Sequence, residues 1–151
     1  MKTLLIVFHT GGVKTARMAE AVERGARTET GVKVIVKRCA DAGPEDVLAA
    51  DGLILGTPEN FGYMSGMMKD FLERVFYACE GKVNGRPYAL FVGAGQDGTG
   101  AVTSVERIVL GLRLRKVHDP IIGLKELTPE ILSSCEALGA ALAAGLAMGV
   151  F

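Results

Sequence analysis

The residues best suited to chemistry lie in three short loops, and the first loop follows an apolar run at the start of the chain. It contains His9, Thr10, Gly11, Gly12, Val13, Lys14 and Thr15. Its glycines let backbone N–H groups turn inward, its threonines offer hydroxyl donors, and the helix expected after it adds positive partial charge. The loop therefore suits an anion such as phosphate, although an ordinary glycine turn capped by threonine explains it equally well. It is not a P-loop, because no Gly-Lys-Ser/Thr sequence ends it.

The second loop follows another apolar run and combines backbone donors with flat apolar side chains. It contains Thr57, Pro58, Glu59, Asn60, Phe61 and Gly62, and Tyr63 comes next. A planar, electron-poor ring would fit against Phe61 or Tyr63, and Gly62 would let the backbone approach the edge of that ring. The alternative is that Phe61 is a hydrophobic plug, and the position at the end of a strand favours the binding site.

The third loop, from Gly93 to Gly98, contains Gly95, Gln96 and Asp97 and matches the pattern GxGxxG. With Asp119 further along the chain it could be a dinucleotide fingerprint. A lone match is weak evidence, however, and this one follows the fourth strand of a chain too short for a second mononucleotide-binding half. We interpret it as a third glycine-rich loop that closes over a ring.

The elements that carry these loops alternate between apolar runs and helical periodicity. Strands are expected near Thr3–Phe8, Val32–Val36, Gly52–Leu55, Pro87–Val92 and Val117–Ile122, the last interrupted by Pro120 at an edge or bulge. Helices are expected at about 15–29 (closed by Gly31), in two turns from Pro44, at 64–79, at 99–112, and from Pro129 with Thr128 as N-cap. This alternation predicts one domain, residues 1–151, with a five-stranded parallel sheet of order 2-1-3-4-5 between two helical layers. The three loops then meet at the carboxyl edge of the sheet, where such folds bind ligands.

Composition excludes several classes of function. Seventeen basic residues balance seventeen acidic ones, so no electrostatic footprint for nucleic acid or for an anionic membrane is present. The three cysteines are widely spaced and show no metal-ligand spacing, which favours reduced thiols in a cytoplasmic protein without a metal site. The uncharged stretch from Ala137 to Phe151 is shorter than a spanning helix, so it is expected to be a buried helix or a subunit contact.

Self-association is a further alternative. The C-terminal helix and the face formed by Met64, Met67 and Met68 could pair with a second copy in a homodimer. The simpler interpretation is that both cover the sheet.

The segment from Gly56 to Gly66, followed by Lys69, Phe71 and Arg74, resembles the flavodoxin-like FMN proteins. It looks closest to the NAD(P)H-dependent oxidoreductases related to the tryptophan repressor-binding-protein-like quinone reductases. The resemblance implies a flavodoxin-like three-layer fold with FMN as cofactor. It places the phosphate at residues 10–15, the isoalloxazine ring at 57–62 with the amides of 60–62 near N5 and the pyrimidine, and residues 95–98 over the other side. The chain departs from the family pattern at Gly12 and Val13, where a hydroxyl and a glycine are usual, so a weakened or rearranged phosphate grip is expected.

Two functions follow from the resemblance. In the first, NAD(P)H passes hydride to FMN and a quinone or similar small-molecule acceptor is then reduced; no side chain in the loops is identified as an obligatory acid or base. The second is an electron carrier of the flavodoxin type that docks on a redox partner protein. Such carriers are typically acidic and this chain is neutral, which favours the enzyme. A receiver domain is excluded, because His9, Gly56 and Thr57 stand where that fold needs acidic residues.

Overall fold

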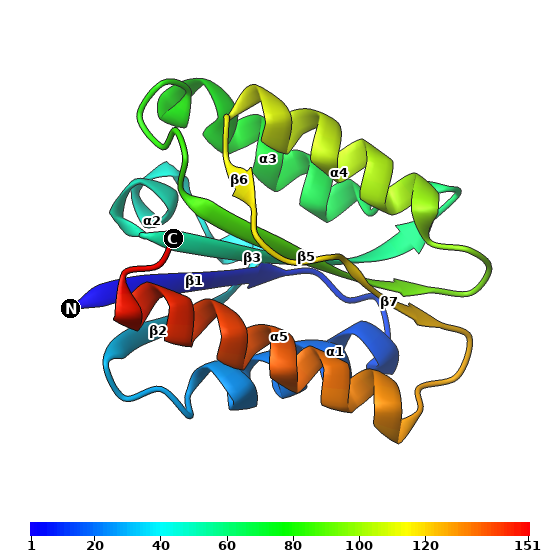
Figure 1. Cartoon of the computed structure of the whole chain (residues 1–151). Helices are drawn as coiled ribbons and strands as arrows, with labels where there is room; N and C mark the ends of the chain where they lie inside the picture. Colours follow the sequence, from blue (N-terminus) through cyan, green and yellow to red (C-terminus); the bar gives the residue numbers. More distant parts are fainter.

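The computed structural model describes residues 1–151 and contains a parallel sheet between two layers of helices (Figure 1). The strands are β1 (Lys2–Phe8), β2 (Val32–Arg38), β3 (Gly52–Asn60), β4 (Tyr63–Met64), β5 (Pro87–Ala94), β6 (Arg115–Lys116) and β7 (Ile121–Leu124). The helices are α1 (Val13–Ala26), the short 3-10 turn η1 (Cys39–Asp41), α2 (Pro44–Ala49), α3 (Gly66–Cys79), α4 (Thr99–Gly111) and α5 (Pro129–Met148).

The central sheet has the order β2-β1-β3-β5-β6, and β7 also pairs with β5. All these pairs are parallel. Because β6 and β7 together hold the place of one edge strand, this is the predicted order of five with the last strand divided. The predicted flavodoxin-like α/β fold is confirmed.

Three predicted boundaries were wrong. The fifth strand pairs with β5 at Arg115–Lys116 and Ile121–Leu124, so its bounds differ from Val117–Ile122, whereas the predicted interruption at Pro120, which has no N–H to donate, is confirmed. The first helix ends at Ala26 and not near Glu29. Just after this end, the backbone N–H and the hydroxyl of Thr28 both donate to the Gly25 carbonyl. These bonds occupy a carbonyl that would accept a backbone N–H if the helix continued. The third strand continues to Asn60, through most of the predicted loop.

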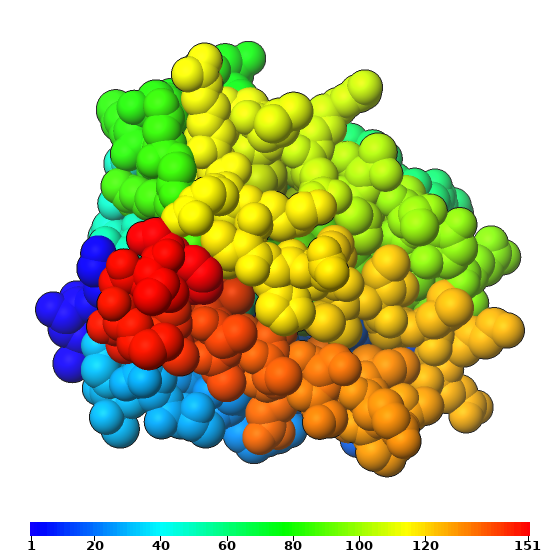
Figure 2. All heavy atoms as spheres, viewed as in Figure 1, coloured from blue at the N-terminus to red at the C-terminus, as the bar shows by residue number.

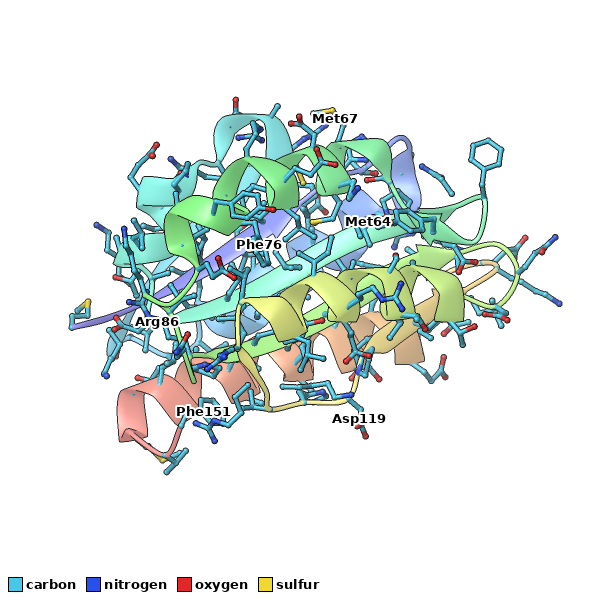
Figure 3. All side chains as sticks on the ribbon, turned by 90° about the horizontal axis from the view of Figure 1, so that it is seen from above. Met64, Met67, Phe76, Arg86, Asp119 and Phe151 are labelled. Atoms are coloured by element: carbon cyan, nitrogen blue, oxygen red, sulfur yellow. The ribbon has the colours of Figure 1, made fainter.

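Apolar side chains fill the space on both faces of the sheet, because a parallel sheet must be covered on each side. Helices α2, α3 and α4 cover one face and α1 and α5 cover the other (Figure 1). Met64 and Met68 are buried in the core between the sheet and helices α2, α3 and α4, and Met67 packs against this core. Figure 3 labels Met64, which lies in β4, and Phe76, which lies in α3. The methionine face therefore covers the sheet, as the simpler interpretation predicted.

Helix α5 begins as predicted, with the Thr128 hydroxyl accepting the N–H of Ile131 and Pro129 in first position. At 20 residues it is, by length and composition, the one helix apolar enough to cross a membrane. In this fold it packs along α1 and the sheet through Leu138, Leu142 and other buried residues. Figure 2 shows its outer side as a surface band beside the segment between α4 and β7.

Candidate functional site

A cavity of about 320 Å³ lies at the carboxyl edge of the sheet, where the predicted loops converge. Residues from all three loops line it: Thr10, Gly11, Gly12, Val13, Lys14, Thr15, Pro58, Asn60, Gly93, Ala94 and Gly95. The structure thus brings together the whole 10–15 segment, two residues of the second loop and the start of the third. His9, Thr57, Glu59, Phe61, Gly62, Gln96, Asp97 and Gly98 do not line this cavity.

The start of α1 forms one wall of the cavity and carries unpaired donors. Gly12 is the N-cap and offers no side chain, and the N–H groups of Val13, Lys14 and Thr15 donate to no protein acceptor. The hydroxyl of Thr15, a residue only 3% exposed, makes no hydrogen bond within the protein. Unpaired amides at a helix start favour an anion, because they add to the positive end of the helix dipole. This donor set fits the phosphate of FMN.

Thr10 braces the loop before α1. Its hydroxyl donates to the Gly12 carbonyl and accepts the Gly12 N–H at 3.2 Å. The side chain therefore closes a turn on its own backbone, a common role for threonine. Whether this loop holds the phosphate differently from the family pattern stays a prediction.

Lys14 crosses from α1 to the far strands of the sheet. Its ammonium donates to the Ala94 carbonyl at 2.7 Å and to the Gly123 carbonyl at 3.1 Å. Burial lowers its pKa from the ordinary value. The side chain connects α1, β5 and β7 at the cavity and places a cation beside the unpaired amides, so Lys14 is a stronger candidate than its sequence position suggested.

Gly93 permits this close approach of α1 to β5. A β-carbon at Gly93 would lie 2.6 Å from Thr15 Oγ1 and 3.2 Å from Lys14 Cδ. Any side chain there would displace the two residues that form the cavity wall. Gly93 and Ala94 line the cavity although the predicted site began at Gly95; the sequence signals for them were their place at the end of a strand and in the GxGxxG match.

The second segment is a β-hairpin and not an open loop. β3 pairs with β4 through Glu59 with Met64 and Asn60 with Tyr63, and Phe61 and Gly62 form the turn with φ of 55° and 69°. Two positive φ angles match the type I′ turn that suits hairpins. A phenylalanine in this conformation costs about 1–2 kcal/mol. Its ring is fully exposed and lies outside the cavity, so the proximity of Phe61 to a flavin ring stays a prediction.

Thr57 is buried and ties the end of β3 to the start of α3. Its hydroxyl donates to the Pro58 carbonyl at 2.8 Å and accepts the Ser65 N–H at 3.0 Å. Ser65 in turn caps α3 by accepting the Met68 N–H at 3.2 Å. The side chain of Thr57 therefore fixes the end of β3 relative to the start of α3. Thr57 itself does not line the cavity, whereas Pro58 and Asn60 do.

Glu59 connects the second segment to the third. One carboxylate oxygen accepts the Gly98 N–H at 3.1 Å and the other accepts the Ala101 N–H at 3.2 Å, both at the start of α4. The Ser104 hydroxyl adds a bond by accepting the Met64 N–H at 3.0 Å. The carboxylate of Glu59 thus holds the hairpin and the α4 start together, and its contribution to a site is one of positioning.

The rest of the third loop is organised by Asp97. One carboxylate oxygen accepts the N–H of Thr99 at 2.6 Å and its hydroxyl at 2.5 Å, and these bonds lower the pKa of Asp97. Gln96 is exposed, and Gly98 is the N-cap of α4. Asp119 lies in a separate depression with Lys116 and His118, near the edge of the sheet (Figure 3). The dinucleotide interpretation of the GxGxxG match therefore has no acidic partner in the cavity.

His9 lies just outside the cavity at the end of β1. The backbone N–H of His9 donates to the Gly56 carbonyl at 3.0 Å, and the ring Nδ1 is buried without a hydrogen-bond partner. Burial, with a smaller effect of Arg38, lowers the pKa of the imidazole. The ring is therefore neutral near pH 7 and carries no charge to the site.

Comparison with known proteins identifies the family. A model of the NADPH-dependent FMN reductases matches residues 40–124, more than half of the chain. The chain belongs to this family. The matched part of the NADPH-dependent FMN reductase model includes the β3–β4 hairpin, α3, β5 and α4, so it covers two of the three segments at the cavity.

Individual relatives carry two kinds of name. The chain is 38% identical over 100 residues to a flavodoxin of Aquifex aeolicus, covering 66% of this chain and 54% of that protein. It is 31% identical over 126 residues to an NAD(P)H dehydrogenase (quinone) of Acidithiobacillus ferrooxidans, covering 70% of this chain and 63% of that protein. The chain thus spans between half and two thirds of the length of these relatives.

Solved structures show the same fold. An archaeal flavodoxin matches with a TM-score of 0.83 at 21% identity, covering 95% of this chain and 98% of the other. A flavodoxin, WrbA-like protein from Agrobacterium tumefaciens matches with a TM-score of 0.77 at 23% identity, covering 99% of both chains. The predicted resemblance to flavodoxin-like proteins and to the WrbA-like quinone reductases among them is confirmed.

Proposed function

We propose that this protein binds FMN and uses NAD(P)H to reduce a quinone or a similar small-molecule acceptor. The observation that carries the proposal is the α1 start, with three unpaired amides and the Thr15 hydroxyl facing a cavity shared by the three segments. Bound FMN supplies the acceptance and release of hydride, which no side chain of the cavity can perform. The net reaction converts NAD(P)H, a proton and a quinone into NAD(P)⁺ and a hydroquinone.

The residues of the chain bind and orient the cofactor. The amides of residues 13–15 and the Thr15 hydroxyl hold the phosphate, and the Lys14 ammonium supplies a nearby positive charge. Pro58, Asn60 and Gly95 form the opposite wall, where a flat ring would lie. Glu59 and Thr57 fix the positions of that wall through the bonds described above.

A titration with FMN tests the first half of the proposal. We expect the flavin fluorescence to be quenched and the melting temperature to rise as the protein binds FMN. An unchanged fluorescence and an unchanged melting temperature at FMN concentrations up to the millimolar range would refute it.

An electron carrier is the second candidate, because the Aquifex aeolicus relative bears the name flavodoxin. The two candidates differ in turnover. With FMN bound, the enzyme oxidises NADH or NADPH continuously when a soluble quinone such as menadione is present. The carrier binds FMN equally well but gives no turnover above that of free FMN. The neutral charge of the chain favours the enzyme.

A further inference from the structure

A second cavity, of about 630 Å³, lies on the opposite side of the β3–β4 hairpin. Its lining includes Gly62, Tyr63, Lys69, Gly100, Thr103 and Arg107. These residues come from the hairpin turn, α3 and α4. The cavity shares no residue with the α1 cavity, and the two flank the same pair of segments.

The charge of this second cavity is positive. Lys69 and Arg107 line it and no carboxylate does. Arg107 is exposed and makes no ion pair or side-chain hydrogen bond within the protein. Lys69 pairs only with Glu73, at 2.8 Å, one turn further along α3 and 65% exposed. Such exposed helix pairs contribute little, so the lysine is available to a stronger anion.

Polar donors surround the two cations. The exposed hydroxyl of Thr103 borders the cavity; Thr99 also lines it, but its hydroxyl donates to Asp97. In the first turn of α4, Asp97 accepts the Thr99 N–H and Glu59 accepts the Ala101 N–H, whereas the Gly100 N–H has no protein acceptor. Two cations, one free hydroxyl and one free amide, gathered from α3 and α4, match a phosphate group.

The position of the cavity relates it to the flavin site. A β-carbon at Gly100 would lie 2.0 Å from the Gly62 carbonyl oxygen, so the first turn of α4 packs directly on the hairpin turn. Both residues of this contact line the second cavity, and Pro58 and Asn60 of the same hairpin line the α1 cavity. A molecule that reacts at a flavin in the α1 cavity and also reaches the second cavity must extend past the hairpin, and a dinucleotide is long enough to do so.

We propose that the second cavity binds a phosphate group of the nicotinamide dinucleotide that reduces the flavin. The proposal rests on the proposed function, since it assigns a place to the electron donor. Arg107 and Lys69 contact the phosphate, and Thr103 with the Gly100 amide completes its ligands.

The test compares Arg107→Gln and Lys69→Gln with Arg113→Gln. Arg113 is an exposed arginine just beyond the other end of α4 whose side chain has no partner, so its replacement is a matched loss of charge outside the cavity. Wild type and variants, as the full chain loaded with FMN, are titrated with 2′,5′-ADP and with ADP, and KM is measured for NADPH and NADH. We expect each cavity variant to weaken probe binding and raise KM by about tenfold or more, as the loss of one charge-assisted bond does.

The two probes distinguish the sources of phosphate. If only 2′,5′-ADP and NADPH are affected, the cavity binds the 2′-phosphate; if ADP and NADH are affected equally, it binds the pyrophosphate. Either result supports the proposal, provided that Arg113→Gln matches wild type and that the affinity for FMN and the melting temperature do not change.

The proposal is overturned if both cavity variants bind the probes as Arg113→Gln does. The phosphate-site proposal and the proposed function can be refuted independently of each other. Absence of FMN binding refutes the flavin site, whereas the probe titration of the FMN-free chain still decides whether the cavity holds a phosphate.

Discussion

Replacement of Glu59 tests whether one carboxylate holds the β3–β4 hairpin and the start of α4 together. The side chain accepts the N–H groups of Gly98 and Ala101 at 3.1 and 3.2 Å, and both belong to the start of α4. Each such capping bond contributes about 0.5–2 kcal/mol. Glu59→Ala removes both and is expected to lower the free energy of unfolding by about 2 kcal/mol. Glu59→Gln keeps one acceptor oxygen and is expected to cost about 1 kcal/mol.

The measurement is urea unfolding of each variant, followed by circular dichroism, with Glu126→Ala as control. Glu126 is an exposed acid before α5 that makes no hydrogen bond. For a chain of this length 1 kcal/mol corresponds to about 2–4 °C, so Glu59→Ala should melt about 4–8 °C below wild type. The graded order of wild type, Gln and Ala is as important as the size of the change.

A second readout connects stability to the site. Since β3 lines the cavity proposed for FMN through Pro58 and Asn60, and Glu59 between them is bonded to α4, loss of these bonds should weaken FMN binding in the same order as it lowers stability. If Glu59→Ala unfolds within 0.5 kcal/mol of Glu126→Ala, the carboxylate does not hold α4 in solution and the positioning argument fails.

Three further predictions concern separate parts of the chain. Thr15→Val should raise the Kd for FMN about tenfold, measured by fluorescence, with no change in unfolding, because its hydroxyl has no protein partner. Arg86→Met should cost about 2–3 kcal/mol in urea, because the guanidinium donates to the carbonyls of Val47, Leu48 and Ala50 at 2.6–3.1 Å and so caps α2; Figure 3 labels this side chain. Burial raises the pKa of Cys39 to about 12 and that of Cys135 to about 11 from 9.0, so above pH 9 the folded thiols keep protons that the unfolded thiols release. Stability should therefore fall as pH rises from 9 to 11, by up to about 1.4 kcal/mol per unit for each thiol, and Cys135→Ala should flatten that fall.

The fold was predictable because its strongest signals are local. The runs at Leu4–Val7 and Leu90–Val92 are apolar without interruption, as strands covered on both faces must be, and they are buried as predicted. Thr128 and Pro129 mark the start of α5 within a few residues of sequence. Once strands and helices alternate in this way, the handedness of the connections leaves few topologies, and the loops must meet at one edge.

The errors arose where contacts distant in sequence decide the structure. No local pattern predicts the contacts of Lys14, because its acceptors, Ala94 and Gly123, are 80 and 109 residues away. The hairpin at Phe61 was missed because the segment lacks the Asn-Gly or Asp-Gly pair that usually signals a two-residue turn. No local pattern predicts a phenylalanine in the left-handed region.

The Phe61 turn shows how the segment is stabilised in spite of its local preference. An exposed phenylalanine with positive φ costs energy and buries nothing, so the hairpin cannot derive its stability from the turn itself. Contacts with α4 stabilise the hairpin instead: Glu59 and Met64 form hydrogen bonds to α4, and Gly100 packs closely on Gly62. The hairpin and the first turn of α4 therefore behave as one unit, and both cavities are built against it.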